Sequence, residues 1–326
     1  MLKAYKASIQ RAKRTADDQL RDWVANHYAD LPSLPAIKGP VMVHHIPRFL
    51  AMRRDSGERK IALVVFDGMA IDQWAHIRDV LVEERRDLGF DESACFAWLP
   101  TVTSVSRQAL FSGLKPREIS DSIDTTAQDS THWSRFWQDQ GLRAPEVVYR
   151  KGLRRTDQLV DLSTSLDGPM IKIAGIVVNT IDDFVHGAFL GRRAIVNQIT
   201  DWVKSGFVEN LFALLLDRGF NVYVTADHGN LEAIGKGRPN QGVAPEMKGE
   251  RVRIYGNEAL AESSCASAQN AFRLSVSRLP LNFFPMYAAG DTAFVANGEQ
   301  IVAHGGMSVH ELIVPFIQIS YLSNQQ

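Results

Sequence analysis

The amino-acid sequence predicts an α/β fold in which a mostly parallel central sheet is flanked by helices. Three largely apolar runs, residues 61–66, 171–178 and 222–225, have the length of buried strands, and each ends abruptly in polar residues. Stretches with helical spacing lie between them, and this alternation is typical of a parallel sheet. Ligands of such sheets collect at the carboxyl ends of the strands. The polar residues after these runs are therefore the first candidates for a functional site.

Residues 1–58 are predicted to form a helical N-terminal segment that precedes a main domain, residues 59–326. Residues 7–26 are rich in Arg, Ala, Gln and Asp and have few apolar side chains, which is typical of a surface helix. Prolines then break the pattern, at Pro32, Pro35 and Pro40. A charged stretch that contains a glycine, residues 53–60, marks the boundary.

The first half of the main domain begins with its strongest strand signal, residues 61–66. We expect a helix through Arg86, a second strand over residues 94–99, and helices over residues 104–113 and 132–140. Gly113 suits the carboxyl end of the third of these elements.

The densest basic run, residues 150–155, is expected to be a solvated loop. Contact with the phosphate backbone of a nucleic acid is the alternative.

The second half repeats the alternation. A strand over residues 171–178 is followed by helical spacing over 191–218, which Gly206 interrupts and Gly219 ends, and then by a strand over 222–225. Residues 231–300 are less regular and are expected to form an insertion or cap, with short strands at 252–255 and 292–295. The last apolar run, residues 313–319, contains Pro315, and proline predicts an edge strand.

Composition narrows the class of protein. The chain has 326 residues, is 45% hydrophobic and carries a net charge of -1, so the overall charge gives no sign of nucleic-acid or membrane binding. The two cysteines, Cys95 and Cys265, cannot form a disulfide framework. No apolar run is long enough to span a bilayer, and the start lacks the apolar core of a signal peptide. We therefore expect a cytoplasmic protein without membrane contact.

Side chains that bind metals follow all three apolar runs, and a late segment adds one more. A spacing of four residues places Asp182 and His186 on one face of a helical turn. Carboxylates and imidazoles together suit zinc, and manganese less strongly. Two ions with about three ligands each would leave positions open for substrate. The candidate ligands are Asp67, Asp182, His186, Asp227, His228 and His304.

A nucleophile is available between a predicted strand and a predicted helix. Residues 100–107 read Pro-Thr-Val-Thr-Ser-Val-Ser-Arg and offer several hydroxyl groups there. A hydroxyl at a helix N-terminus meets unpaired N–H groups and the positive end of the helix dipole. Metal binding would lower its pKa and make the alkoxide a nucleophile.

The order of these motifs resembles the alkaline phosphatase superfamily. Within it the chain is most similar to the PglZ family, the phosphatase-like proteins of BREX bacteriophage-defence systems. The resemblance covers about residues 60 to 320 and includes the segments 249–255 and 304–315. The motifs are Asp67-Gly68, Pro100-Thr101-Val102-Thr103, Asp182 with His186, Asp227-His228-Gly229 and His304-Gly305.

The resemblance implies an alkaline-phosphatase-like core and a metal-dependent phosphoesterase. One ion would be held by Asp67, Thr103, Asp227 and His228, and the other by Asp182, His186 and His304. Thr103 would be the nucleophile of a phosphodiesterase, because Gly113 and Pro116 follow it by ten and thirteen residues, as in the phosphodiesterase branch. That branch has an Asn where this chain has Ser106, followed by Arg107, and these two residues are the candidates for binding phosphate.

The implied cofactors are two divalent ions, zinc or, as an alternative, manganese. The implied partners are other BREX proteins and a phosphate ester, with a nucleotide or nucleic acid among the candidates. A phosphomonoesterase or mutase-type enzyme is one alternative. A scaffold that binds metal and defence partners without turnover is another. At the residue level, Thr103 could instead cap its helix, with Ser104 as the rival nucleophile, and Asp183 could replace Asp182.

Overall fold

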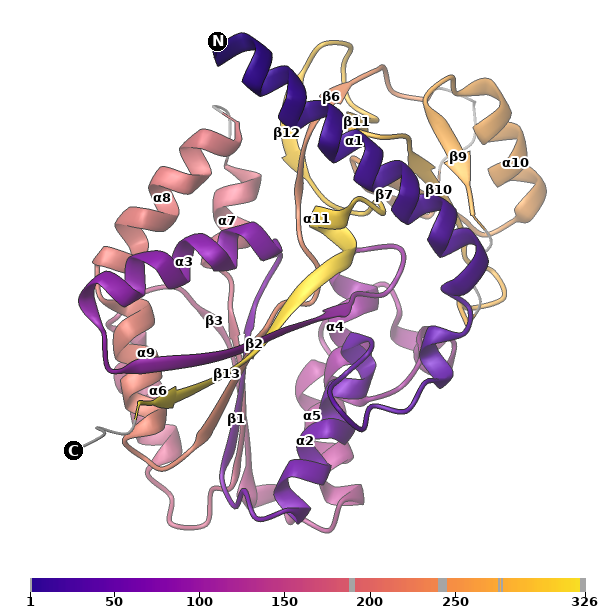
Figure 1. The fold of residues 1–326 in the computed structure, drawn as a ribbon. Coiled ribbons are helices and arrows are strands. Elements are labelled where there is room, and N and C mark those ends of the chain that lie inside the picture. The colour runs from indigo at the N-terminus through magenta and orange to yellow at the C-terminus, as the bar shows by residue number, and fades with distance from the viewer. Residues whose placement is uncertain (1, 188–190, 240–244, 275, 277, 323–326) are drawn as a thin grey trace.

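The computed structural model describes residues 2–187, 191–239, 245–274, 276 and 278–322. A six-stranded sheet forms its centre, in the order β2-β13-β5-β1-β4-β3 (Figure 1). Strand β13 runs antiparallel to both of its neighbours, and the pairs among β5, β1, β4 and β3 are parallel. The predicted mostly parallel sheet is therefore confirmed. Its strands are β1 (Ile61–Phe66), β2 (Leu88–Phe96), β3 (Val147–Leu153), β4 (Ile173–Val178), β5 (Asn221–Thr225) and β13 (Ile313–Tyr321).

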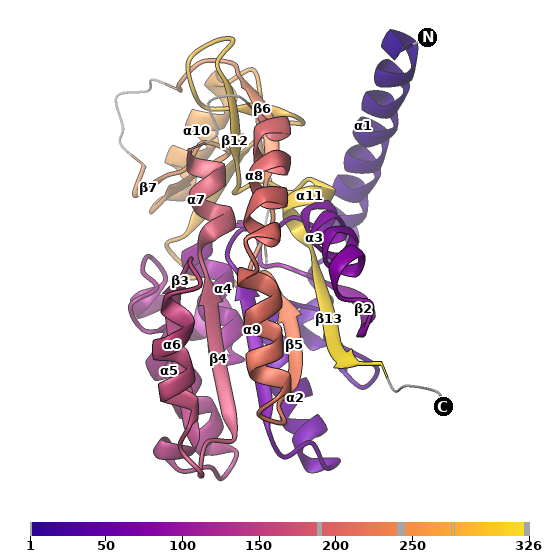
Figure 2. The ribbon, with the colours of Figure 1, turned by 90° about the vertical axis from the view of Figure 1, so that its left-hand side faces the viewer.

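Helices cover both faces of this sheet, which explains why β1 and β4 are apolar and buried along their whole length. One face carries α2 (Ile46–Asp55), α4 (Thr103–Ser112) and α5 (Asp129–Asp139) (Figure 1). The other carries α3 (Ile71–Glu84), α6 (Gln158–Leu166) and α9 (Phe207–Leu216) (Figure 2). Helices α7 (Thr180–His186) and α8 (Arg192–Lys204) reach beyond the sheet (Figure 2). Gly206 and Gly219 have positive φ and separate α8, α9 and β5 as predicted.

The described residues between 231 and 303 lie beyond the carboxyl ends of the parallel strands (Figures 1 and 2). Two small sheets have the orders β7-β8-β10-β9 and β11-β6-β12. The predicted strand at 252–255 is confirmed, and that at 292–295 is shorter. The division at residue 58 and the description of 231–300 as an insertion stay predictions, and residues 240–244, 275 and 277 lie outside the described part. The elements are β6 (Leu231–Gly235), β7 (Met247–Lys248), β8 (Val252–Tyr255), α10 (Glu258–Ser267), β9 (Ala271–Arg273), β10 (Phe284–Ala288), β11 (Thr292–Ala293) and β12 (Gln300–Ala303).

The N-terminal helix α1 (Leu2–His27) contacts α11 (Val309–Leu312), the short helix that precedes β13. Just after it, the Tyr28 hydroxyl donates to Ala97 O and accepts from Leu99 N, both at 2.9 Å. Asp17 accepts a hydrogen bond of 2.8 Å from Val309 N at the start of α11. The short 3-10 helices are η1 (Leu31–Ser33), η2 (Val43–His45), η3 (Pro116–Ser122) and η4 (Ala144–Glu146).

The prediction that Pro315 marks an edge strand is wrong. Strand β13 lies inside the sheet, between β2 and β5. Its pairing with β5 begins at Phe316, so Pro315 precedes the first residue paired on that side. The Pro315 carbonyl instead accepts a 2.8 Å hydrogen bond from Thr225 Oγ1. The missing N–H of proline therefore removes no bond to β5.

Two other expectations along the chain need correction. Strand β2 starts six residues earlier than predicted, at Leu88, because pairing with the long β13 extends it through exposed polar residues. The first part of the basic run 150–155 is not a loop but belongs to the edge strand β3. The last two arginines of that run pair with nearby carboxylates, Arg154 with Asp183 at 2.5 Å and Arg155 with Asp157 at 3.0 Å.

Gly175 in β4 allows α5 to lie close to the sheet. A Cβ added at Gly175 would lie 2.8 Å from Trp133 Nε1, and Trp133 is fully buried. We expect Gly175→Ala to lower the free energy of unfolding by about 1–3 kcal/mol, because the indole must shift in a packed core. Chemical denaturation measures this change. Gly39→Ala is the control, since a Cβ at Gly39 meets nothing within 4 Å. If the two variants have the same free energy of unfolding, Trp133 does not lie as close to Gly175 as described.

Candidate active site

Three neighbouring strands bring three carboxylates to one edge of the sheet. Strand β1 pairs in parallel with β5 on one side and β4 on the other, so all three end at the same level. Asp67 follows β1 directly, and Asp227 lies two residues beyond β5. Asp182 lies in the first turn of α7, the helix that follows β4. The parallel topology thus gathers side chains that are far apart in the sequence.

The first ligand group consists of Asp67, Asp227 and His228, whose potential ligand atoms all lie within 4.8 Å of one another. All three side chains are buried. Each carboxylate has one oxygen bonded by the protein: Asp67 Oδ2 accepts from Asn179 at 2.6 Å, and Asp227 Oδ1 accepts from Gly68 N at 3.0 Å.

The other oxygens, Asp67 Oδ1 and Asp227 Oδ2, are buried without a hydrogen-bond partner. Buried anionic oxygens without partners are costly, so this arrangement fits a cation at that point.

The pKa shifts of Asp67 and Asp227 also fit a cation between these two carboxyls. Burial and the neighbouring Asp227 raise the pKa of Asp67 to about 7, against the lowering effect of Arg107. Burial likewise raises the pKa of Asp227. The two carboxyls therefore resist being ionised together while only protein groups surround them. A divalent cation between them would favour the ionised form of both.

His228 is held in the tautomer that a ligand needs. Its Nδ1 lies 3.0 Å from the carbonyl oxygen of Gly229, which can only accept, so Nδ1 carries the proton and Nε2 the lone pair. Burial lowers the pKa of His228, which keeps the ring neutral. Thr103 Oγ1 lies 2.9 Å from His228 Nε2, at the first residue of α4. The predicted nucleophile and ligand are therefore brought together.

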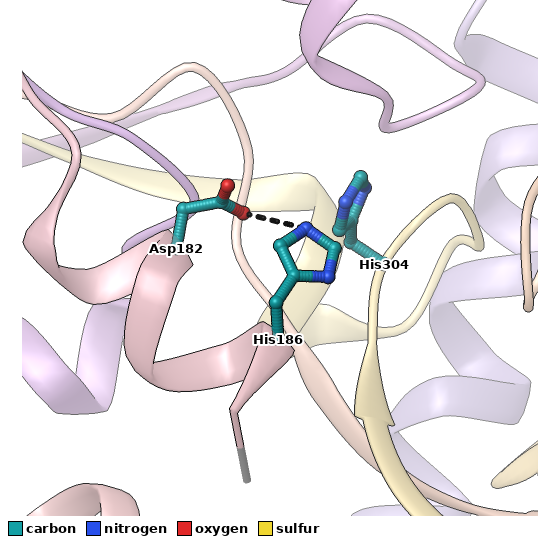
Figure 3. Close-up of side chains that lie close together, drawn as sticks. All are labelled: Asp182, His186 and His304. Carbon is teal, nitrogen blue, oxygen red and sulfur yellow. Dashed lines mark ion pairs between the residues drawn. The ribbon is translucent and has the colours of Figure 1, made fainter. Parts of the chain in front are cut away.

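The second ligand group consists of Asp182, His186 and His304, again with potential ligand atoms within 4.8 Å (Figure 3). Asp182 Oδ1 and His186 Nε2 form an ion pair at 3.4 Å, which raises the pKa of His186 to about 8. His304 Nδ1 donates to Thr101 O at 3.0 Å, which leaves Nε2 for a ligand. The His304 ring stacks on His228 with 4.2 Å between ring centroids, so the two groups adjoin.

Burial lowers the pKa of His304 to about 4, so this ring is neutral near pH 7. Asp183, the alternative to Asp182, is half exposed and pairs with Arg154. It is not part of either ligand group.

The two predicted phosphate-binding residues lie behind the ligands. Arg107 is buried, with Nη1 2.5 Å from Asp67 Oδ2 and Nε 3.0 Å from Asp129 Oδ2. It serves first as the counter-ion of two carboxylates, and its contact with phosphate stays a prediction.

The Ser106 hydroxyl accepts from Trp98 N at 3.1 Å and gives its one proton to Asp227 O at 2.5 Å. It has no proton left for a phosphate oxygen, so this geometry does not support the predicted contact at Ser106.

Two further residues support the site without having been assigned a role from the sequence. Asn179 follows β4 directly and donates to Asp67 Oδ2. Thr101 holds the segment that carries His304, through its carbonyl and its hydroxyl. The sequence offered one hint for each of them: Asn179 is a polar residue at a strand end, and Thr101 lies in the segment that carries the nucleophile. Their partners, however, come from distant parts of the chain.

Comparison with known proteins identifies the family. The family model described as the BREX system PglZ alkaline phosphatase-like domain matches residues 48–319. The chain belongs to the PglZ family. The resemblance to the PglZ family, which rested on the motifs, is thereby confirmed. The predicted class, a phosphoric ester hydrolase, is confirmed as well, because the matching domain is described as alkaline phosphatase-like.

Solved structures of other proteins share the fold of this PglZ domain. Murine ectonucleotide pyrophosphatase/phosphodiesterase 5 has 13% sequence identity and a TM-score of 0.57, over 79% of this chain and 87% of that one. Phosphonoacetate hydrolase from Sinorhizobium meliloti 1021, in complex with phosphonoformate, has 13% identity and a TM-score of 0.51, over 82% and 91% of the two chains. These similarities confirm the alkaline-phosphatase-like fold. A search of curated proteins gives no match.

Within the described part of the PglZ chain, no helix combines the length and the apolar composition that crossing a membrane requires.

The buried Arg107 should be important for the stability of the metal-free protein. We expect Arg107→Met to lower the free energy of unfolding by about 3–5 kcal/mol, because it leaves the Asp67 and Asp129 carboxylates without their counter-ion. Urea denaturation in the presence of a chelator measures this. Arg155→Met is the control, because Arg155 forms only an exposed pair with Asp157. An unchanged unfolding midpoint for Arg107→Met would show that the carboxyls are neutral or otherwise compensated.

Proposed function

We propose that this PglZ domain hydrolyses phosphate esters, and diesters in particular, at a centre of two divalent metal ions. One observation carries the proposal: two adjoining ligand groups and the Thr103 hydroxyl meet at the carboxyl edge of the sheet. The partnerless oxygens of Asp67 and Asp227 face this region from buried positions and call for positive charge. Family membership supports a phosphoesterase, since the matching domain is described as alkaline phosphatase-like.

Each ligand group would hold one ion. Asp67, Asp227 and His228, with Thr103, would form the first site. Asp182, His186 and His304 would form the second. Oxygen and imidazole ligands suit zinc, with manganese as the alternative. When bound, the two ions supply the positive charge that stabilises the attacking and leaving oxygens of an in-line displacement.

The protein groups would prepare Thr103 for attack. Thr103 begins α4, so its hydroxyl lies at the positive end of the helix dipole and beside the unpaired N–H groups of the first turn. An alkoxide there is favoured, and the same N–H groups can receive a phosphoryl oxygen. Thr103 would give up its hydroxyl proton to water, and Oγ1 would attack phosphorus while one ester oxygen leaves and takes up a proton, which forms a threonine phosphodiester that keeps the other ester group. Water would then cleave the bond between Thr103 Oγ1 and phosphorus, regenerate the hydroxyl and release a phosphate monoester.

Preference for diesters rests on the sequence and on relatives of the same fold. Gly113, which has the positive φ of a helix C-cap, and Pro116 follow Thr103 at the spacing of the phosphodiesterase branch. The murine relative is named a pyrophosphatase/phosphodiesterase, and a threonine-to-alanine variant of it, described as inactive, was solved in complex with AMP. A nucleotide or nucleic acid is therefore the substrate class to test first.

The description of the matching family names the BREX system, and this supports a role there. We propose that it acts there with other BREX proteins, in the cytoplasm, in defence against bacteriophage. A monoesterase or mutase-type enzyme and a metal-binding scaffold without turnover are the rival functions. The first differs in its substrate, and the second would show intact metal binding without hydrolysis of any ester.

Removal of the nucleophile should separate chemistry from metal binding. We expect Thr103→Ala to lower kcat for bis(p-nitrophenyl) phosphate by at least about 1,000-fold, the scale seen when a nucleophile is removed, while both ions stay bound. Absorbance assays and elemental analysis of the same samples measure the two quantities. The control is Ser104→Ala, which should keep its activity if Thr103 is the nucleophile.

Retained turnover in Thr103→Ala would move the nucleophile to Ser104 or to water. Faster hydrolysis of p-nitrophenyl phosphate than of the diester by the unmodified protein would favour the monoesterase. If carefully prepared protein contains no transition metal, and none restores activity after chelation, the proposed mechanism is wrong.

Metal binding at the second group should release a proton near pH 7. The pKa of His186 is raised to about 8 by the Asp182 carboxylate, so the metal-free ring is protonated below that pH and must lose its proton to bind an ion. The affinity of this group should therefore fall as the pH falls below about 8. Calorimetric titrations with zinc at pH 7, in buffers of different ionisation enthalpy, count the protons released. His186→Asn should release fewer, and equal counts would contradict this assignment.

A further inference from the structure

A buried ion pair, Arg251 with Glu311, lies outside both ligand groups. The two side chains are only 1% and 0% exposed. They meet in a two-pronged arrangement, with Arg251 Nε 2.7 Å from Glu311 Oε1 and Nη2 3.0 Å from Oε2. Arg251 directly precedes β8 in the small sheet, and Glu311 lies in α11, just before β13. The pair therefore joins the small sheet to the central one.

Glu311 holds the loop that follows His304. Its Oε1 accepts from Gly306 N at 2.8 Å, and its Oε2 accepts from Ser308 N at 3.1 Å and from Ser308 Oγ at 2.8 Å. Its backbone carbonyl accepts from Gly229 N at 2.9 Å, beside His228. One residue thus fixes the segments that carry a ligand of each group.

The same loop is tied to the nucleophile segment. Thr101 Oγ1 donates to Gly306 O at 2.6 Å and accepts from Gly305 N at 3.1 Å. The Thr101 carbonyl accepts from His304 Nδ1, and Thr103 follows two residues later. A continuous set of hydrogen bonds therefore runs from Glu311 through the 304–306 loop to the segment that carries the nucleophile.

Arg251 extends this set into the small sheet. Its Nη1 donates to Thr292 O, and its backbone carbonyl accepts from Ala288 N at 2.9 Å. The loop lies so close to the pair that a Cβ at Gly306 would come within 2.6 Å of Arg251 Nη2. There is no space for a side chain at that position, so the loop is fixed by contact as well as by hydrogen bonds.

Stability alone is a poor account of this pair, because replacing a buried ion pair with apolar residues is often neutral or stabilising. Apolar residues, however, could not accept the hydrogen bonds from Gly306 and Ser308. We propose that Arg251 and Glu311 are positioning residues that fix His304 relative to His228 and so set the separation of the two metal-binding groups. This inference rests on the metal centre proposed above.

The test compares charge removal with removal of the whole pair. Full-length metal-free protein is titrated with zinc alone, in competition with a chromophoric chelator, for Glu311→Gln and for the double variant Arg251→Met with Glu311→Leu. We expect both to bind one of the two ions about 10- to 100-fold more weakly, the usual effect of removing a residue that orients a ligand. The double variant leaves no buried charge unpaired, so it should unfold later than Glu311→Gln, which leaves the Arg251 charge without its counter-ion.

Amide hydrogen exchange in the metal-free variants provides a second readout that does not need the metal. Exchange at Gly229, Gly306 and Ser308 should be faster in both variants. The control is Arg273→Gln, which breaks pairs with Glu258 and Glu262 in the same small-sheet region and should change neither the zinc affinity nor this exchange. If the double variant does not fold, Arg251→Lys, which keeps the charge but loses the two-pronged contact, takes its place with the same expectation.

Wild-type affinity for both ions and unchanged exchange in a folded double variant would overturn the inference. If the wild-type protein binds two ions but hydrolyses no ester, the proposed reaction is wrong. The zinc affinities of the variants still test the positioning role in that case. If the wild-type protein binds no ion, the metal centre fails. Amide exchange then decides whether the pair holds the loop, and the metal-spacing role is rejected.

Discussion

The structure depends on the gathering of three carboxylates at one edge of a parallel sheet. Strands β5, β1 and β4 are neighbours and end at the same level, which forces Asp227, Asp67 and Asp182 into one region. Like charges that are buried together repel one another and lose their hydration. The protein compensates only partly, with one buried guanidinium at Asp67 and with hydrogen bonds to one oxygen of each inner carboxylate. The remaining oxygens, Asp67 Oδ1 and Asp227 Oδ2, are buried without a hydrogen-bond partner, which supports the proposed cation.

This constraint explains the residues that surround the site. Asn179 and Arg107 hold one oxygen of Asp67, which leaves Oδ1 without a partner. Backbone carbonyls accept from the Nδ1 atoms of His228 and His304, so that both Nε2 lone pairs remain available. Asp67, His228 and His304 are thus each oriented by a contact that uses their other polar atom. Asn179, Gly229 and Thr101, which are not candidate ligands themselves, therefore help to orient the candidate ligands.

Glycine allows these segments to approach one another. Gly229 lies so close to α11 that a Cβ there would be 1.9 Å from His310 O, and Gly306 leaves room for the Arg251–Glu311 pair. The carboxyl-terminal segment therefore has two functions: it brings His304 to the ligands, and it continues into β13 at the middle of the sheet. Because β13 is antiparallel, its amino end lies at the same edge as the carboxyl ends of its parallel neighbours. A late histidine can reach the site for this reason.

The sequence by itself determined the parallel core and supplied the candidate ligands, because a buried strand followed by acids and histidines is a local pattern. The division of these candidates into two groups came from the resemblance to the family, and their role as ligands stays a prediction. Three features were decided only by the tertiary structure. β13 lies inside the sheet despite Pro315, Ser106 and Arg107 point behind the ligands, and Glu311 pairs with Arg251. Each depends on contacts between distant segments, such as the 60-residue separation of Arg251 and Glu311. The hydrophobic pattern and the residue types specify which polar groups are present. Which hydrogen-bond partner each group finds is fixed only when the helices and sheets pack together.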